Sequence, residues 1–318
     1  MHDLVVIGAG PAGMTAAIYA RRAARSVLVL EAVSCGGQIL NTPDIENYPV
    51  EAHISGFDFS QKLHAQAEGL GAEFVFEKAV EVRDLGEVKE IVTTKNSYQA
   101  RAVILATGSE NRKLGLEDED RLVGRGISYC ATCDGNFYRN KVVAVVGGGN
   151  TALEDALYLA DLAQKVYLIH RRDSFRGEET TTARLREKPN VEIICNANVT
   201  RLIAEKRLKA IEITDKLDGS LRTVELNGLF IAVGRIPENQ DFAGLVQLDE
   251  AGYVLAGEDC HTGTPGIFTA GDNRTKLLRQ LVTATADGAM AATEAVKYLR
   301  ETEQAYTDSL LPSWGGVC

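Results

Sequence analysis

The sequence predicts an α/β protein made of two Rossmann-like, three-layer nucleotide-binding domains. A strand, a glycine turn, a helix and a second strand follow one another at the start of the chain, and the same succession returns near its middle. The length of 318 residues agrees with this prediction, because about 150 residues is a common size for one domain.

Charge and apolar patterning exclude several kinds of partner. The formal net charge is −10, and there is no block of lysine and arginine that would suit a nucleic acid. The longest apolar runs are strand-sized, well short of the ~20 residues that span a bilayer. The start MHDLVVIGAG lacks the features of a secretory leader. We therefore expect a cytoplasmic protein with no membrane partner and no nucleic-acid partner.

The start of the chain predicts a dinucleotide site. The run DLVVIGAG is a buried strand that ends in glycines, PAGMTAAIYARRAA has helical spacing, and SVLVLE is a second strand. The turn reads Gly8-x-Gly10-x-x-Gly13, in which the glycines allow a tight turn, a close approach of pyrophosphate and close helix packing. Glu31 ends the second strand, where an acid accepts the ribose hydroxyls of a dinucleotide.

The second copy, KVVAVVGGGNTALEDALYLADLAQKVYLIHRR, carries the turn Gly147-x-Gly149-x-x-Ala152. At the position that corresponds to the acid of the first copy stands His170, and three arginines follow it: Arg171, Arg172 and Arg176. A cationic cluster there suits a 2′-phosphate and favours NADPH over NADH; the alternative is a solvated basic helix start. An acid-ended site and an arginine-ended site suggest FAD in the first copy and NADPH in the second, with hydride transfer between them.

A pair of cysteines, Cys130 and Cys133, lies just before the second glycine turn. The six cysteines of the chain would give about 0.1 such pair by chance. A zinc site needs a second pair, and the remaining cysteines are scattered, so a redox-active dithiol is favoured over structural zinc. Asp134 follows directly; it can shuttle the proton of a thiol, or serve as a turn residue. The histidines form no ligand pair, and we expect no metal.

The motifs CATCDG, GGGNTALEDALYL, HRRDSFR, GAGPAG and TAGD with a later RQ resemble those of low-molecular-weight bacterial thioredoxin reductases, over roughly residues 1–300. The resemblance implies a homodimer with thioredoxin as electron acceptor. It implies an FAD domain over residues 1–112 and 242–318, and an inserted NADPH domain over residues 113–241 that carries the disulfide.

The resemblance also implies which residues hold the cofactors. The FAD residues come from four segments: the first turn with its acid, the loop GGQILNTPDIENYP, the segment ILATGS and the closing motif GIFTAGDNRTKLLRQ. They are Gly8, Gly10, Pro11, Ala12, Gly13, Glu31, Gly37, Gln38, Asn47, Thr107, Gly108, Gly271, Asp272, Arg279 and Gln280. For NADPH they are Gly147, Gly149, Asn150, Thr151, Ala152, His170, Arg171, Arg172 and Arg176. For the later FAD segments the alternative is a polar loop.

By resemblance, Cys133 is the thiol on the flavin side and Cys130 attacks the disulfide of the partner. NADPH and the disulfide then share the inserted domain, so this domain is expected to rotate about crossovers near Arg112 and Asp241 between half-reactions. The alternatives are a related reductase for another thioredoxin-like or peroxiredoxin-linked acceptor, and a non-enzymatic redox sensor. In the tail, Trp314 and Cys318 are interpreted as part of a flexible end, with a flavin cover or a third thiol as alternatives.

Overall fold

The computed structural model describes residues 1–310 and divides them into two compact units. The first unit comprises Met1–Glu110 and the chain from Ile236 onward, and the second comprises Asn111–Arg235. The predicted domain boundaries at residues 112 and 241 stay predictions. Trp314 and Cys318 lie outside the described residues.

The first unit contains a mixed sheet in the order β3-β2-β1-β6-β5-β4, and β17 also pairs with β6. Strands β1, β2, β3, β6 and β17 are parallel, whereas β4 and β5 are antiparallel to their neighbours. The first half of β6 pairs with β5 and its last three residues pair with β17. The strands are β1 (His2–Ile7), β2 (Val27–Glu31), β3 (Glu73–Phe76), β4 (Ala79–Asp84), β5 (Lys89–Thr93), β6 (Ser97–Leu105) and β17 (Ile267–Thr269).

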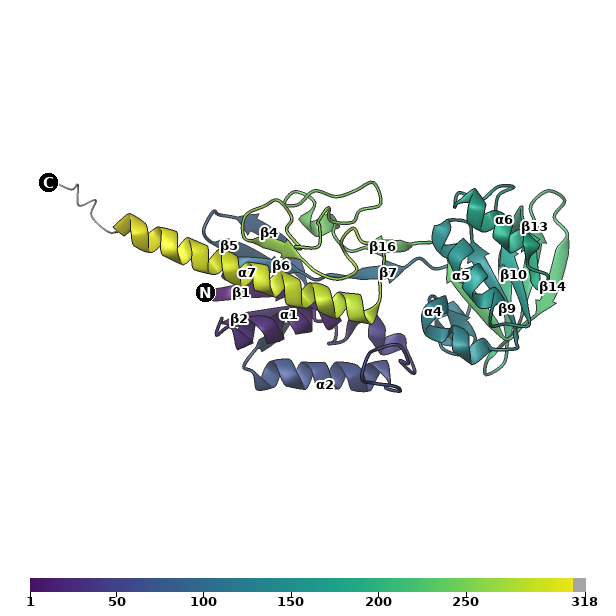
Figure 1. The fold of residues 1–318 in the computed structure, drawn as a ribbon, viewed down its shortest axis with the longest axis horizontal. Helices are drawn as coiled ribbons and strands as arrows, with labels where there is room; N and C mark the ends of the chain where they lie inside the picture. Colours follow the sequence, from purple (N-terminus) through teal and green to yellow (C-terminus); the bar gives the residue numbers. More distant parts are fainter. Residues whose placement is uncertain (311–318) are drawn as a thin grey trace. The chain divides into compact units, whose positions relative to one another are not determined.

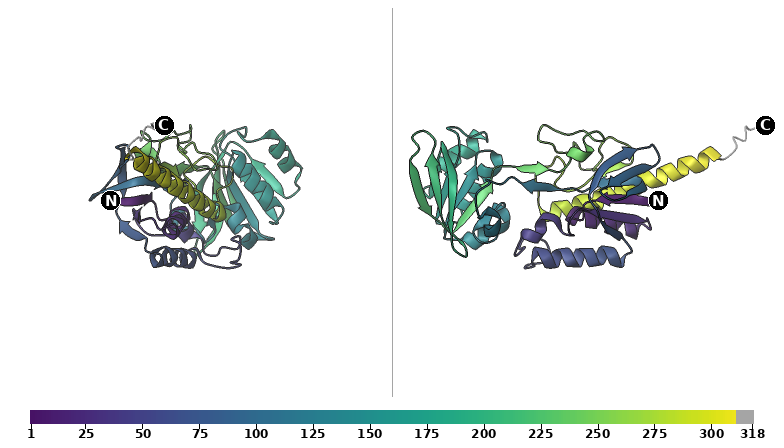
Figure 2. Two further views of the ribbon diagram at one scale, coloured as in Figure 1. Left: turned by 60° about the vertical axis from the view of Figure 1, so that its left-hand side comes forward. Right: turned by 180° about the vertical axis from the view of Figure 1, so that it is seen from behind.

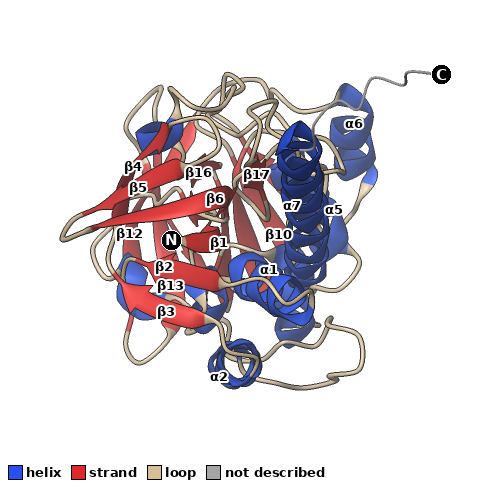
Figure 3. Ribbon diagram, turned by 90° about the vertical axis from the view of Figure 1, so that its left-hand side faces the viewer, coloured by secondary structure: helices blue, strands red, loops and turns tan. Residues whose placement is uncertain are grey.

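Helices cover one face of this sheet, where α1 and α7 pack side by side (Figures 1 and 3). In β1, Leu4 and Val6 face a core shared with Met14 of α1, while Val5 and Ile7 face a second core on the other side. Because alternate residues of a strand point to opposite faces, burial on both faces explains the continuous apolar run. The helical elements are α1 (Pro11–Arg22), α2 (Gly56–Gly69), α7 (Leu281–Leu310), η1 (Gly37–Asn41) and η3 (Gln240–Phe242).

The second unit contains a parallel sheet in the order β11-β10-β9-β15-β8 and an antiparallel sheet in the order β12-β13-β14. Helix α5 covers one face of the parallel sheet and the antiparallel strands cover the other (Figures 1 and 2). The strands are β8 (Ile127–Ser128), β9 (Val142–Gly147), β10 (Lys165–Ile169), β11 (Val191–Ile194), β12 (Ala197–Ala204), β13 (Leu208–Asp215), β14 (Leu221–Glu225) and β15 (Gly228–Ala232). The helical elements are α3 (Glu119–Leu122), α4 (Ala131–Asp134), α5 (Asn150–Ala160), α6 (Glu179–Glu187) and η2 (Gly135–Tyr138).

The two units repeat one topology. Each begins with a strand, a glycine turn, a helix and a parallel strand: β1–α1–β2 in the first unit and β9–α5–β10 in the second. Each then adds a third parallel strand and an antiparallel meander. The predicted fold class, two Rossmann-like three-layer units, is therefore confirmed.

The chain passes between the units twice, through β7 (Ser109–Asn111) and β16 (Arg235–Pro237), and these two strands pair with each other. Arg112 N donates to Gly234 O at 3.0 Å, and Glu238 N donates to Gly108 O at 3.4 Å. Because the partners run in opposite order along the chain, the pairing is antiparallel. The two connections therefore form one short ribbon.

Candidate active site and cofactor loops

The first glycine turn joins β1 to α1 through positions that need glycine. Gly8 has a φ of +105°, and a Cβ there would lie 2.3 Å from Ala106 O. A Cβ on Gly13 would lie 1.9 Å from Gly8 O, so helix and turn are in direct contact. A Cβ on Gly10 would have nothing within 4 Å. Because α1 starts after Gly10 without a side-chain cap, its free N–H groups face an open space that fits a phosphate group.

Glu31, the acid at the end of β2, is bound to the turn itself. One carboxylate oxygen accepts from Ala9 N at 2.8 Å, and the other accepts from Val33 N at 2.9 Å. The loop after β2 closes on the same turn, because Gly36 N donates to Ala9 O at 2.8 Å and a Cβ on Gly37 would lie 3.4 Å from Gly10 Cα. Glu31 and Gly37, which the sequence separates from the turn, are thus brought to it.

The second glycine turn has the same construction. A Cβ on Gly147 would lie 2.3 Å from Ala232 O and 2.6 Å from the Cβ of Ala152. Gly149 has nothing within 4 Å of an added Cβ, and α5 starts after it without a side-chain cap. Asn150 Oδ1 accepts from Glu178 N at 2.8 Å, so this side chain holds the segment that follows β10. Thr151 is exposed.

His170 is buried against the second turn, with 5% of its surface exposed. A Cβ on Gly148 would lie 2.1 Å from the imidazole, which is hydrogen-bonded to Ser174 O at 3.1 Å and stacks on Phe175. Burial lowers the pKa of His170. The imidazole therefore shapes the loop as a neutral ring, and the positive charge of the predicted cluster comes from the arginines alone.

Arg171, Arg172 and Arg176 are exposed, and within residues 1–308 none of their guanidinium groups forms an ion pair or a hydrogen bond. Their backbones are fixed: Arg171 O accepts from Lys216 Nζ at 3.0 Å, Arg172 O accepts from Asn196 N at 3.0 Å, and Arg176 N donates to Gly148 O at 2.7 Å. Three uncommitted cations therefore lie on the segment after β10, which the Arg176 backbone joins to the second turn, and such cations fit a phosphate monoester.

Cys130 and Cys133 form a disulfide, with their Cα atoms 5.3 Å apart. Cys130 N donates to Ser128 Oγ at 3.1 Å, and Asp134 N donates to Cys130 O at 3.1 Å. Cys133 N donates to the Cys130 sulfur at 3.2 Å, and an N–H directed at sulfur favours the thiolate when the bond opens. Asp134 is half-buried directly after the pair. The prediction of a dithiol pair in this segment is confirmed.

The closing motif of the first unit is held from several sides. A Cβ on Gly271 would lie 2.9 Å from the Cβ of Ala12, so this turn lies on the start of α1. Arg279 stacks over Tyr253, with its guanidinium carbon 4.0 Å from the ring centroid, and donates to backbone carbonyls including that of Asp272. In this structure Arg279 therefore braces the loop that contains Asp272.

Two residues that the resemblance assigns to FAD, Asn47 and Gln280, are joined by a hydrogen bond of 3.1 Å from Asn47 Nδ2 to Gln280 Oε1. Gln38 is exposed, and Pro11 and Ala12 form the first turn of α1. At the other predicted segment, Thr107 Oγ1 donates to Asn239 Oδ1 at 3.1 Å. Gly108 lies at the start of the ribbon between the units.

Sequence reasoning missed polar residues that hold these loops together. Asn239 is fully buried and donates to Gly252 O and Asn273 O at 2.9 and 2.7 Å. Asn273, also fully buried, donates to Leu105 O at 3.0 Å. Asp287 binds the loop after β17. Only Asp287 left a signal in the sequence, as a lone acid in the run TATADGAMAA.

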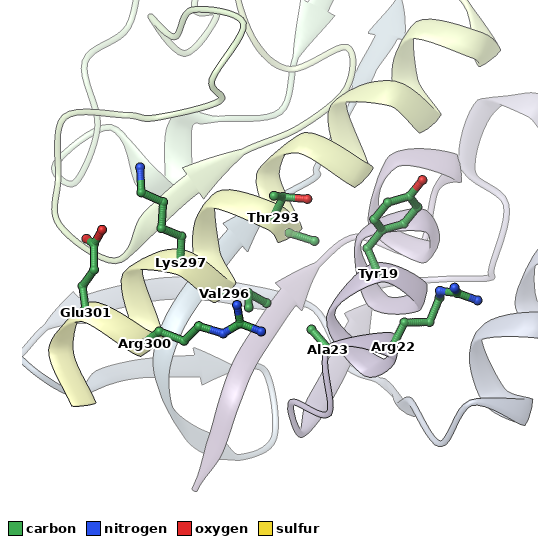
Figure 4. Close-up of a pocket in the computed structure, with 9 residues that line it drawn as sticks. Tyr19, Arg22, Ala23, Thr293, Val296, Lys297, Arg300 and Glu301 are labelled. Carbon is green, nitrogen blue, oxygen red and sulfur yellow. The ribbon is translucent and has the colours of Figure 1, made fainter. Parts of the chain in front are cut away.

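Two further surface features belong to the first unit. A groove of about 450 Å³ lies between α1 and α7, lined by Tyr19, Arg22, Val296 and Arg300 among others (Figure 4). It lies at the end of α1 away from Gly10, so we assign no cofactor to it.

Separately, the potential metal-ligand atoms of Asp44, Glu46 and His53 lie within 4.8 Å of one another. Hydrogen bonding to Asp44 raises the pKa of His53. No helix within the described part of the chain is long and apolar enough to cross a membrane.

This geometry agrees with comparisons to known proteins. The family described as pyridine nucleotide-disulphide oxidoreductase matches residues 2–288. A thioredoxin reductase of Listeria innocua is 43% identical over 306 residues, covering 96% of both chains. One of Bacillus subtilis is 40% identical over 305 residues, with the same coverage. The crystal structure of thioredoxin reductase from Streptococcus pyogenes, 38% identical, matches with a TM-score of 0.90 over 95% of this chain and 99% of that one.

The chain belongs to the pyridine nucleotide-disulphide oxidoreductase family. It is an NADPH-dependent flavoprotein oxidoreductase whose cofactors are FAD and NADPH. The resemblance to bacterial thioredoxin reductases that the motifs indicated is confirmed, as are a redox-active disulfide and an enzymatic function of this class.

Proposed function

We propose that this chain reduces the disulfide of thioredoxin with electrons from NADPH, through the Cys130–Cys133 pair. The observation that carries the proposal is the disulfide lying in the same unit as the second glycine turn and its uncommitted arginines. Bound FAD would supply the two-electron redox chemistry that links hydride donation by NADPH to reduction of the disulfide. The relatives at 43% and 40% identity, both thioredoxin reductases, support the choice of acceptor.

We assign FAD to the first unit and NADPH to the second. The support is the difference between their second strands: β2 ends in Glu31, and β10 leads into the arginine cluster. A carboxylate accepts ribose hydroxyls but repels a 2′-phosphate, whereas guanidinium groups bind it. The uncapped starts of α1 and α5 both fit a pyrophosphate.

We assign Cys130 as the thiol that attacks the partner and Cys133 as the flavin-side thiol. The Cys130 thiolate attacks one sulfur of the partner's disulfide, which forms a mixed disulfide and releases the other sulfur as a thiolate. The Cys133 thiolate then attacks the Cys130 sulfur, which restores the internal disulfide and releases the partner as a dithiol. The partner's two thiolates take up protons, and Asp134 is placed next to the pair to deliver one. The N–H of Cys133 at 3.2 Å from the Cys130 sulfur supports this assignment.

We further propose that the second unit rotates about the β7–β16 ribbon between half-reactions, because donor and disulfide share that unit. A thioredoxin reductase of Lactococcus lactis described as the FR conformation, also 38% identical, matches with a TM-score of 0.67 over 95% of this chain and all of that one. The lower score at equal identity to the Streptococcus relative supports more than one conformation within the family.

The resemblance also supports a cytoplasmic protein that forms a homodimer. Light scattering after gel filtration would test the dimeric state.

The experiment that tests the function is NADPH oxidation followed with oxidised thioredoxin, and with DTNB in the presence and absence of thioredoxin. We expect rapid turnover with thioredoxin and DTNB reduction that depends on it. Turnover with a different thioredoxin-like or peroxiredoxin-linked protein, and none with thioredoxin, would identify that protein as the electron acceptor instead. A flavin that NADPH leaves oxidised would instead favour a redox sensor and contradict the proposal.

A further inference from the structure

A single acid in the first turns of α7 holds the loop after β17. Asp287 is 6% exposed and lies in the run TATADGAMAA of α7. One carboxylate oxygen accepts from Gly271 N at 2.9 Å, from Arg274 Nε at 2.8 Å and from Lys276 Nζ at 2.8 Å. The other accepts from Arg274 Nη2 at 2.8 Å. All four donors belong to residues 271–276, so this loop folds around one carboxylate.

The same loop lies directly on the start of α1. A Cβ on Gly271 would lie 2.9 Å from the Cβ of Ala12, and a Cβ on Gly288 would lie 2.1 Å from Ala12 O. Gly288 follows Asp287 in α7, so the acid stands at the point where α7, the loop and α1 meet. Helix α1 begins after Gly10 with free N–H groups. The Asp287 contacts therefore set how the loop closes over that helix end.

The charged side chains of this network are buried. The side chains of Arg274, Lys276 and Asp287 are 3%, 5% and 7% exposed. Burial alone would raise the pKa of Asp287, but hydrogen bonds from Arg274 and Lys276 hold it below its usual value. With Asp272 in the same loop, two carboxylates stand against the two cations. Removing the charge of Asp287 would leave the loop with a net positive charge, which by itself strengthens attraction for a phosphate.

We infer that Asp287 is a positioning residue for FAD: its carboxylate holds residues 271–276 against the start of α1, in the shape that binds the cofactor. The inference rests on the proposed placement of FAD in the first unit. It differs from a general structural role, because it requires that the cofactor-bound state lose more stability than the empty state. It differs from a charge effect, because weaker binding is expected despite the extra positive charge.

The test uses purified enzyme stripped of FAD, with Asp287→Asn as the main variant. FAD is titrated by flavin fluorescence, and thermal unfolding is followed with and without FAD. We expect the Kd for FAD to rise about tenfold, which corresponds to the loss of one or two well-placed hydrogen bonds. The increase in Tm that FAD gives should shrink accordingly. If Asp287→Asn does not fold, Lys276→Met, which removes one donor to the carboxylate and leaves the Gly271 contact in place, should fold and weaken FAD binding by a smaller factor, about threefold.

Asp84→Asn is the matched control. Asp84 accepts from Lys89 Nζ at 2.6 Å and from Gly86 N at 2.9 Å, so it too joins a lysine and a loop N–H in the first unit. It should lower the Tm of the empty protein and leave the increase given by FAD unchanged. Unchanged or tighter FAD binding in Asp287→Asn would overturn the inference, as would unchanged or tighter binding in Lys276→Met where that variant is the one measured. If wild-type protein itself binds no FAD, the proposed function fails instead.

Discussion

Three arginines beside the second glycine turn, Arg171, Arg172 and Arg176, have fixed backbones and uncommitted guanidinium groups. We expect Arg171→Ala with Arg172→Ala to raise the KM for NADPH and leave the KM for NADH unchanged. Loss of a charge-assisted phosphate contact costs roughly 1.5–3 kcal/mol, or about 10- to 150-fold. Steady-state kinetics with both nucleotides measures the ratio of the KM for NADPH to the KM for NADH. Arg201→Ala, an exposed arginine of the same unit, is the control; similar KM values for both nucleotides in wild-type enzyme would contradict the 2′-phosphate site.

The two cysteines of the disulfide give a spectroscopic prediction. In Cys130→Ser the remaining Cys133 thiolate should produce a long-wavelength charge-transfer band with oxidised flavin, whereas Cys133→Ser should not. Both variants should lose thioredoxin reduction and keep the reduction of flavin by NADPH. Absorbance spectra of the oxidised variants distinguish the thiols, and a band in Cys133→Ser alone would reverse the assignment.

At the scale of elements, α1 and α7 can pack closely because Gly288 has no side chain. A Cβ at this position would lie 2.1 Å from Ala12 O, so Gly288→Ala forces the helices apart. We expect a loss of roughly 1–3 kcal/mol in the free energy of unfolding. Gly69→Ala, at the end of α2, has nothing within 4 Å of the new Cβ and a backbone that alanine adopts. That control should be neutral or slightly stabilising, as urea unfolding would measure; equal effects in both variants would contradict the packing argument.

The far end of α7 is held by charge. Glu303 accepts from Arg25 and Arg101, and these hydrogen bonds lower the pKa of Glu303 to about 2 from an ordinary value of 4.5. A carboxyl with a depressed pKa stabilises the folded state above its unfolded pKa, and this contribution is lost as the pH falls from about 4.5 to about 2.

Because the Glu303 side chain is 42% exposed, solvent screening reduces the contribution to roughly 1 kcal/mol. Glu303→Gln should therefore be less stable than wild type by this amount at pH 7 and equal to it near pH 2. Urea unfolding at several pH values checks the difference, and high salt should diminish it at pH 7. A difference that stays constant down to pH 2 would rule out the titration of Glu303 as its source.

At the scale of the whole chain, sequence reasoning reached what depends on local pattern. Strands buried on both faces and glycine turns recur at fixed spacing, so both nucleotide-binding units could be predicted. The burial of His170 could not, because it depends on contacts with Gly148 and Phe175 in three dimensions. Nor could Asn239, whose amide joins segments that are far apart in the sequence. Buried polar groups of this kind are placed by the need to satisfy hydrogen bonds after folding.

The rotation proposed for the second unit requires the β7–β16 ribbon to change conformation, because both chain connections run through it. Its hydrogen bonds place Glu110 of β7 opposite Ile236 of β16. Burial and the nearby Glu110 raise the pKa of Glu238. The ribbon is therefore short, with three residues in each strand, and carries two neighbouring acids, as suits a segment that changes conformation.

A disulfide from Glu110→Cys with Ile236→Cys would join the two connections, since opposite residues of an antiparallel pair lie about 5 Å apart. We expect the bridged enzyme to lose most of its thioredoxin turnover while NADPH still reduces the flavin, or the reverse, because one conformation is favoured. There are two controls: the same variant with the engineered disulfide reduced, and an enzyme with a bridge between Glu90→Cys and Gln99→Cys in β5–β6. Both enzymes should show normal turnover. Full multiple-turnover activity in enzyme whose ribbon bridge is verified by mass spectrometry would show that this segment need not move.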